Sequence, residues 1–184
     1  MSASTIHIRD ARNEDAERLV LLHYAAVHES AKHDYPQNVL DAWSPPPEDA
    51  RFAWMRWRID SVDSHVLVAQ GQNGSINGFC MFSAADGVIH ALYVSPERSG
   101  NGIGRQLLQR VEALVATHGN GQISLNASKN AVRFYRSQGY TVIRPATQKL
   151  ANGEAMDCYE MIKRPLASAD TAVESPPLHG PYEP

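Results

Sequence analysis

Gly100, Gly102 and Gly104 alternate with other residues directly after an apolar, strand-like run, and they are the part of the chain best suited to chemistry. Glycine carries no Cβ atom, so the backbone at these positions can approach a ligand closely. The residues that follow begin an amphipathic helix, and the free N–H groups and dipole at the start of a helix attract anions. The spacing therefore predicts a site that binds the pyrophosphate of a phosphorylated cofactor.

Two other phosphate-binding motifs differ from this segment at specific residues. A Walker loop requires Gly-Lys followed by Ser or Thr, whereas Gly104 is followed by Arg105 and Gln106. A dinucleotide-binding fingerprint counted from Gly100 and Gly102 requires Gly or Ala where Arg105 stands. A third interpretation is a glycine-rich surface turn before an ordinary helix, which explains the helix but not the three alternating glycines.

The segment Ser99–Gly104 resembles the cofactor motif of the GNAT superfamily of acyl-CoA-dependent N-acetyltransferases. That motif is Gln or Arg, two residues, Gly, one residue, then Gly or Ala. This chain departs from it at the first position, where Ser99 stands one place after Arg98. Further along, Leu125–Tyr140 is similar to the second cofactor segment of the same superfamily. Two motifs in this order are more specific than either motif alone.

The N-terminal half carries a narrower resemblance, to a bacterial YafP-like subgroup, in His23-Tyr24, Asp34-Tyr35-Pro36 and Val39–Trp43. Together the resemblances cover residues 6–164 and imply an α/β fold of the α+β kind, the GNAT fold. In that fold a mixed, mostly antiparallel twisted sheet of about six or seven strands is flanked by about four helices. One splayed parallel pair of strands holds the pantetheine arm. The implied activity is transfer of an acetyl group from acetyl-CoA to a primary amine in a ternary complex.

Amide formation from a thioester makes three demands on a site. A base must deprotonate the amine, whose reference pKa is about 10.4 for a lysine-like group, a donor must face the developing oxyanion, and the departing thiolate takes up a proton. The resemblance implies that Tyr135 is the general acid. His90 is the candidate base, because its strand is similar to that of arylalkylamine N-acetyltransferases and a neutral imidazole can relay a proton. Glu29, Asp34, Tyr35 or a chain of water molecules are other candidates for the base. The structural alternatives are an aromatic ring packed on the sheet for Tyr135 and a hydrogen-bonded core histidine for His90.

The resemblance also implies cofactor contacts along the strand, the glycine turn and the second motif. The expected cofactor-binding residues are Leu92, Tyr93, Val94, Arg98, Ser99, Gly100, Asn101, Gly102, Ile103, Gly104, Arg105, Asn126, Asn130 and Tyr135. The backbone of the first three is expected to pair with pantetheine amides, with one N–H facing the thioester oxygen. Asn130 is also a candidate N-cap for the helix that it begins.

The acceptor is less well specified by the sequence. The expected acceptor-binding residues are Tyr24, His28, Glu29, Tyr35 and Trp43. Their aromatic rings suit a cation or an aromatic amine, whereas Trp54 and Trp57 stand at helical spacing and are expected in the core. We favour a small-molecule amine. The alternatives are a protein lysine or N-terminal acetyltransferase, and a non-catalytic sensor of acyl-CoA, which Ser99 permits but Tyr135 argues against.

Hydrophobic periodicity predicts the elements that position these residues. Strands are expected over residues 6–9, 65–70, 75–82, 88–94, 122–127, 140–144 and 154–162. Helices are expected from an Asn13 cap to residue 30, over 48–59, from 103 to the Gly119–Gly121 stop, and over 130–138. The order strand, helix, strand after residue 88 predicts one parallel pair within an otherwise antiparallel sheet.

Composition limits the class of protein. With 184 residues, 43% of them hydrophobic, the chain can bury one sizeable core, assigned to residues 1–166, and the Pro-rich tail 167–184 is expected to be flexible. A net charge of −3 gives no basic footprint for nucleic acid and no polybasic membrane patch. We expect a cytoplasmic protein with no metal site, with Cys80 and Cys158 as small buried hydrophobic residues. The last strand offers an edge for pairing, so a homodimer stays open.

Overall fold

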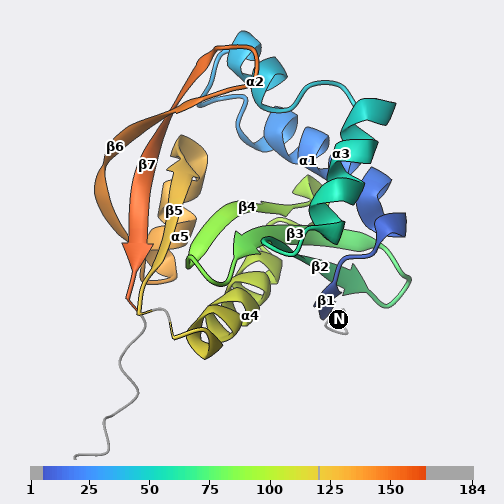
Figure 1. Ribbon diagram of the computed structural model, residues 1–184. Helices are drawn as coiled ribbons and strands as arrows, with labels where there is room; N and C mark the ends of the chain where they lie inside the picture. The colour runs from blue at the N-terminus through green and yellow to red at the C-terminus, as the bar shows by residue number, and fades with distance from the viewer. Residues whose placement is uncertain (1–5, 120, 165–184) are drawn as a thin grey trace, which may run out of the picture.

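The computed structural model describes residues 6–119 and 121–164, and the predicted tail 167–184 lies outside them. Seven strands form one sheet in the order β1-β2-β3-β4-β5-β7-β6 (Figure 1). The strands are β1 Ile6–Asp10, β2 His65–Gly71, β3 Ile76–Ser83, β4 Val88–Val94, β5 Ile123–Ser128, β6 Thr141–Lys149 and β7 Ala155–Lys163. The helices are α1 Ala16–Ser30, α2 Gln37–Trp43, α3 Asp49–Asp60, α4 Ile103–Thr117 and α5 Val132–Ser137, with 3-10 turns η1 Asn13–Asp15, η2 Pro96–Arg98 and η3 Lys129–Ala131. The predicted mixed, mostly antiparallel sheet is confirmed.

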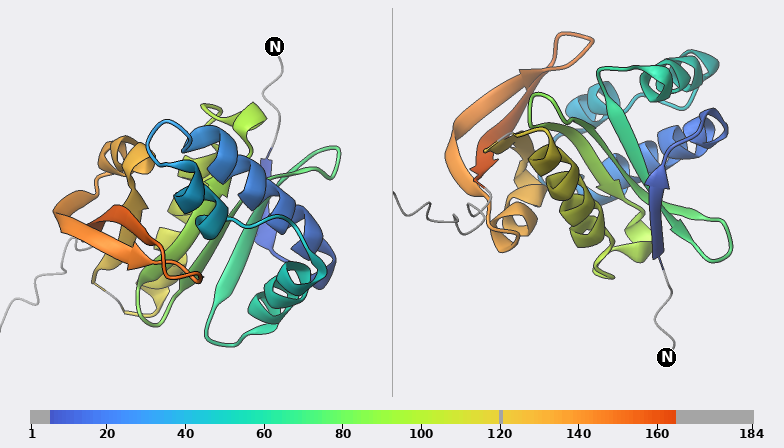
Figure 2. Two further views of the ribbon diagram at one scale, coloured as in Figure 1. Left: turned by 90° about the horizontal axis from the view of Figure 1, so that it is seen from above. Right: turned by 60° about the horizontal axis from the view of Figure 1, so that its bottom comes forward.

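Helices cover both faces of the sheet (Figure 2). On one face α1 and α3 pack on the middle strands, with Leu19, Val20 and Met55 in a buried cluster. On the other face α4 buries Leu107 and Val111 in a larger cluster. The apolar stripe of α4 repeats every three or four residues, which is the spacing that lets one face of a helix lie on a sheet. No helix within the described ranges is long and apolar enough to cross a membrane.

The sheet separates in its middle. The parallel strands β4 and β5 pair only at Val88↔Ser124 and Ile89↔Leu125, whereas β4 stays paired with β3 as far as Val94. A β-bulge opposite Met81 and Phe82 leaves one extra residue on β4 at the point where the two strands part. The predicted parallel pair is therefore confirmed, and beyond its first two residues it opens into a gap.

The expectations for three residues, Asn13, Trp54 and Trp57, are wrong. Asn13 does not cap the first helix: its side-chain amide donates to Asp60 at 3.0 Å, and Asp15 instead accepts the Arg12 N–H at 2.8 Å. Trp54 and Trp57 are not in the core but are 49% and 61% exposed. Their helical spacing places both on one side of α3, and the opposite side, which carries Met55, is the one that packs on the sheet.

Two further differences are an additional helix and a longer strand. The short helix α2 was not expected, since it follows Pro36 and buries only Val39 and Leu40, too little for a visible period. Strand β6 runs through Pro145 to Lys149, well past the expected end. β6 is an edge strand of the sheet, and a proline without an N–H is tolerated there.

Cys80 and Cys158 are both free and buried, as expected.

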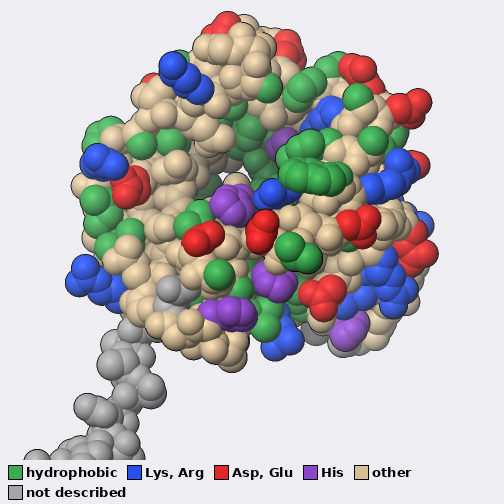
Figure 3. Space-filling model, in the orientation of Figure 1, with side chains coloured by type: hydrophobic (Ala, Val, Ile, Leu, Met, Phe, Trp, Pro, Cys, Tyr) green, Lys and Arg blue, Asp and Glu red, His purple; other side chains and the backbone are tan. Residues whose placement is uncertain are grey.

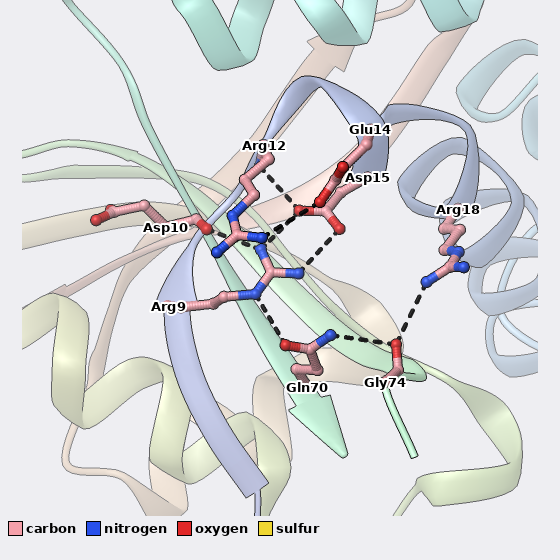
Figure 4. A network of polar contacts seen from close by, with 8 residues as sticks. All are labelled: Arg9, Asp10, Arg12, Glu14, Asp15, Arg18, Gln70 and Gly74. Atoms are coloured by element: carbon pink, nitrogen blue, oxygen red, sulfur yellow. Dashed lines mark hydrogen bonds and ion pairs between the residues drawn. The ribbon is translucent and has the colours of Figure 1, made fainter. Parts of the chain in front are cut away.

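A polar network ties the first strand to the first helix (Figure 4). Arg9 donates two hydrogen bonds to the buried carboxylate of Asp15, at 2.7 and 3.0 Å. The same guanidinium donates to Gln70 on β2 at 2.9 Å. The Arg9 contact and the Arg12 N–H outweigh burial and hold the pKa of Asp15 below its ordinary value. This network fixes where α1 begins relative to the sheet.

Candidate functional site

The first feature of the site is a cavity of about 540 Å³ that opens where β4 and β5 separate. Its walls come from the end of β4, the glycine turn, the start of α4 and the segment after β5, with α1 along one side. Eleven of the expected cofactor-binding residues line it: Leu92, Tyr93, Val94, Arg98, Ser99, Gly100, Gly102, Ile103, Gly104, Arg105 and Asn130. Asn101, Asn126 and Tyr135 lie outside its lining and border other cavities. The fold thus gathers most of one predicted set around a single space.

The three glycines have different structural roles in the turn and the start of α4. Gly100 and Gly102 have φ of +78° and +75°, a region that favours glycine, and a Cβ atom on either would meet nothing within 4 Å. Gly104 has an ordinary helical backbone, but a Cβ there would lie 3.2 Å from the Phe134 ring. Two glycines therefore shape an open turn, and the third lets Phe134 reach the cavity wall.

The start of α4 is suited to an anion. The first hydrogen bond into the helix joins the Gln106 N–H to the Gly102 carbonyl at 3.1 Å. The N–H groups before Gln106, in the first turn, have no intrahelical acceptor. Arg98 and Arg105 add two guanidinium groups to the same cavity. Donors, positive charge and open space together fit a diphosphate group.

A second, smaller cavity of about 80 Å³ continues from the first between the separated strands. The two share Leu92, Tyr93 and Ser128 in their linings. The smaller one, which we call the reaction cleft, is also bordered by Tyr135 and His90, the two predicted catalytic residues. Figure 3 shows a hollow near the middle of the face where these strands part, with histidine and charged side chains around it.

Tyr135 is a buried residue in the lining of the reaction cleft. It is 6% exposed, and its ring makes edge contacts with Phe134 and Tyr140 at centroid distances of 5.1 and 5.5 Å. Burial raises the pKa of its hydroxyl well above the ordinary value. The phenol therefore keeps its proton at neutral pH, which is the state that a general acid needs.

His90 is the extra residue of the β-bulge on β4, at the point where the strands part. Its side chain is exposed at the rim of the reaction cleft. Partial burial and the positive charge of Arg58 lower its pKa below 6.5, against a smaller opposing effect of Asp86. The imidazole is therefore neutral at pH 7 and can accept a proton.

A third cavity, of about 600 Å³, opens from the reaction cleft on the side away from the glycine turn. It shares His90, Asn126 and Gln148 with the cleft, and Arg144 and Glu160 stand in its wall. We call it the outer pocket. Sequence reasoning missed Gln148, Arg144 and Glu160, because they come from the β6–β7 hairpin, which carries no motif. The signal that could have found them is the Asn152-Gly153 turn, from which the pairing of the two strands can be counted.

Of the expected acceptor-binding residues, Trp43 borders both the first cavity, beside the glycine turn, and the reaction cleft. Its indole N–H donates to the Tyr93 hydroxyl at 3.0 Å. Behind Tyr93 lies His23, with ring centroids 4.4 Å apart, and His23 Nδ1 accepts from Arg51 at 3.0 Å. Burial, with the charge of Arg51, lowers the pKa of His23 to about 3. A hydrogen-bonded cluster with a neutral His23 thus supports Tyr93, to which Trp43 is bonded at the edge of the site.

Tyr24, His28, Glu29 and Tyr35 do not line any of these three cavities, and their acceptor role stays a prediction. The Tyr35 hydroxyl donates to the Asp157 carbonyl at 2.6 Å and accepts the Lys129 N–H at 2.8 Å. Burial raises its pKa to about 12. In this arrangement Tyr35 joins the end of α1 to β7.

Comparisons with known proteins agree with this geometry. Residues 34–156 match the family model described as an acetyltransferase (GNAT) domain. The uncharacterized N-acetyltransferase YuaI of Bacillus subtilis is 27% identical over 62% of this chain, and the L-amino acid N-acyltransferase MnaT of Escherichia coli is 32% identical over 56% of it. The aligned regions span 66% and 59% of those two relatives, less than two thirds of each.

Solved structures share the fold over most of the chain. A GCN5-related N-acetyltransferase from Rhodopseudomonas palustris superposes with a TM-score of 0.78 and 28% identity, covering 89% of this chain and 98% of that one. YncA from Salmonella typhimurium, a putative acetyltransferase solved with its cofactor acetyl-CoA, gives a TM-score of 0.63 and 24% identity, covering 90% and 96%.

Proposed function

The chain belongs to the GNAT family of acetyltransferases, and on this premise we propose that it is an acyltransferase that transfers an acetyl group from acetyl-CoA to the primary amine of a small molecule. The observation that carries the proposal is the continuity of the three cavities. The glycine turn lies at one end, Tyr135 and His90 lie at the middle, and a polar pocket lies at the other end. Donor and acceptor can therefore enter from opposite sides and meet in the reaction cleft.

The donor side fits acetyl-CoA. The first turn of α4, with Arg98 and Arg105, would hold the diphosphate, and the unpaired edge of β4 from Leu92 to Val94 would pair with the pantetheine amides. YncA, which shares the fold, was solved with this cofactor. When bound, acetyl-CoA supplies an acetyl group activated as a thioester.

The residues of the reaction cleft account for the two proton transfers. His90 is neutral at pH 7 and accepts the proton that the amine must lose, directly or through water. Tyr135 keeps its proton and delivers it to the departing sulfur. A backbone N–H of Leu92 or Val94, at the edge of β4, donates to the carbonyl oxygen as negative charge develops there.

A small-molecule acceptor is supported by the size of the outer pocket, about 600 Å³, which lies within the range of small-ligand sites. It is also supported by the name of MnaT, an L-amino acid N-acyltransferase.

The first test is calorimetric titration of the protein with acetyl-CoA and CoA, with NADH as the control, followed by an amine screen that measures thiol release. We expect binding of the CoA species alone and release that depends on a small amine. Binding without release for any amine would overturn the catalytic proposal, and faster release with peptides would overturn the small-molecule acceptor.

A further inference from the structure

A row of polar side chains crosses three strands in the wall of the outer pocket. Asn126 on β5 pairs with Glu160 on β7, and Glu160 pairs with Arg144 on β6. Residues directly opposite each other on paired strands project from the same face of a sheet. The row therefore leads outward from His90 and the reaction cleft, and neither Arg144 nor Glu160 has a part in the proton transfers described above.

Arg144 has hydrogen-bonding capacity to spare. Its Nε donates to Glu160 Oε2 at 2.6 Å, which is the one side-chain hydrogen bond of Arg144 within the described ranges, and the side chain is 71% exposed. A guanidinium carries five N–H donors, so the end formed by Nη1 and Nη2 stays open to a carboxylate. The contact with Glu160 also restrains the long Arg144 side chain before a ligand binds, so binding costs less side-chain conformational entropy.

The open donors of Arg144 favour an anion over a cation in this wall. Among the described residues that line the outer pocket, Arg144 is the one cation at neutral pH and Glu160 the one carboxylate. Glu160 is already neutralised by Arg144, so an ammonium group would have to compete for it. A carboxylate can instead bind the Nη1 and Nη2 donors of Arg144, which Glu160 leaves open.

We propose that Arg144 binds a carboxylate of the acceptor, so that the acceptor is an amino acid whose amine points toward His90 and whose carboxylate points toward β6. This inference rests on the proposed acetyl transfer and adds the acceptor class and a specificity-determining residue. Glu160 acts as a positioning residue that holds the guanidinium.

The test compares the twenty common L-amino acids with their C-terminal amides as acceptors, with thiol release and product mass as readouts. An amide has the same side chain but a less basic amine, so the chemistry alone favours the amide. We expect at least one amino acid to be acetylated with a kcat/KM about tenfold or more above that of its amide. Equal or faster acetylation of the amides throughout would overturn the inference.

Variants separate the two charged residues of the wall. R144Q is expected to raise KM for the preferred amino acid about tenfold and to leave kcat, and the rate with its amide, unchanged. E160Q keeps a hydrogen-bond acceptor for Arg144 but removes the negative charge, so KM for amino acids should stay the same or fall. R110Q, on the exposed face of α4, is the matched control and should match wild type.

The outcomes distinguish this inference from the proposed function. If E160Q raises KM and the amides are the better substrates, the acceptor's ammonium group binds Glu160 and the inference is wrong, although acetyl transfer stands. If acetyl-CoA binds but no amino acid, amide or other amine releases thiol, the proposed function itself fails.

Discussion

Replacing Tyr135 with phenylalanine removes one oxygen atom from a buried ring and leaves its packing in place. Edge contacts with Phe134 and Tyr140 involve the ring alone, and within the described part of the chain the hydroxyl has no hydrogen-bond partner to lose. The free energy of unfolding should therefore change by less than about 1 kcal/mol. If the hydroxyl protonates the departing sulfur, kcat should fall about 100-fold, which corresponds to about 2.7 kcal/mol of transition-state stabilisation.

Tyr140→Phe provides a matched control in a neighbouring ring. The Tyr140 side chain is also buried, but its hydroxyl donates to Glu112 at 3.2 Å and borders none of the three cavities. Its loss should cost about 1 kcal/mol of stability and leave kcat unchanged. The measurements are urea unfolding, acetyl-CoA affinity and steady-state thiol release. Turnover of Tyr135→Phe within threefold (about 0.7 kcal/mol) of wild type would refute the general-acid role.

Three other changes test the remaining parts of the site and its support. Gly102→Val adds a side chain where φ is +75° beside the first turn of α4, so we expect CoA affinity to fall roughly tenfold or more; wild-type affinity by calorimetry in a folded variant would place the phosphate site elsewhere. His90→Gln should lower kcat by roughly 100-fold, and because the pKa of His90 is lowered, the acid limb of the wild-type kcat/KM profile should lie below pH 6.5; an unchanged profile in the variant would remove His90 as the base. Asp15→Asn breaks a buried pair with Arg9 and should cost about 3 kcal/mol by urea unfolding at pH 7. Since the folded pKa of Asp15 is lowered, that difference should persist above the unfolded pKa of about 3.9 and shrink as pH falls below it; a difference independent of pH would contradict the ion pair's role.

The donor side of the site was largely predictable because its signals are local. Two glycines at positive φ and the apolar period of α4 stand within one short segment, and the strand-helix-strand order predicts the parallel pair. The gap between β4 and β5 was expected only from the resemblance. No sequence pattern near Ile89 indicates that the pairing of β4 with β5 stops after this residue.

The acceptor side was poorly predicted because it depends on long-range pairing. Arg144 and Glu160 meet because each lies eight residues from Asn152, on opposite arms of the last hairpin. The strand expected from the sequence ended at Arg144, so the pairing between Arg144 and the Asn152 turn was not predicted. The exposure of Trp54 and Trp57 could not be inferred either, because periodicity shows that a helix has two faces but not which one a neighbour covers.

The separation of β4 from β5 has a thermodynamic consequence. From Leu92 to Val94, β4 is bonded to β3 on one side and has no described strand on the other, so the molecule contains an interior sheet edge. A ligand that adds its own amides to this edge would act as a missing strand and join the two halves of the sheet. Folding and ligand binding are then linked by mass action, which at 100 times the dissociation constant amounts to about 2.7 kcal/mol. The protein would be most resistant to unfolding in cells when its acyl donor is abundant.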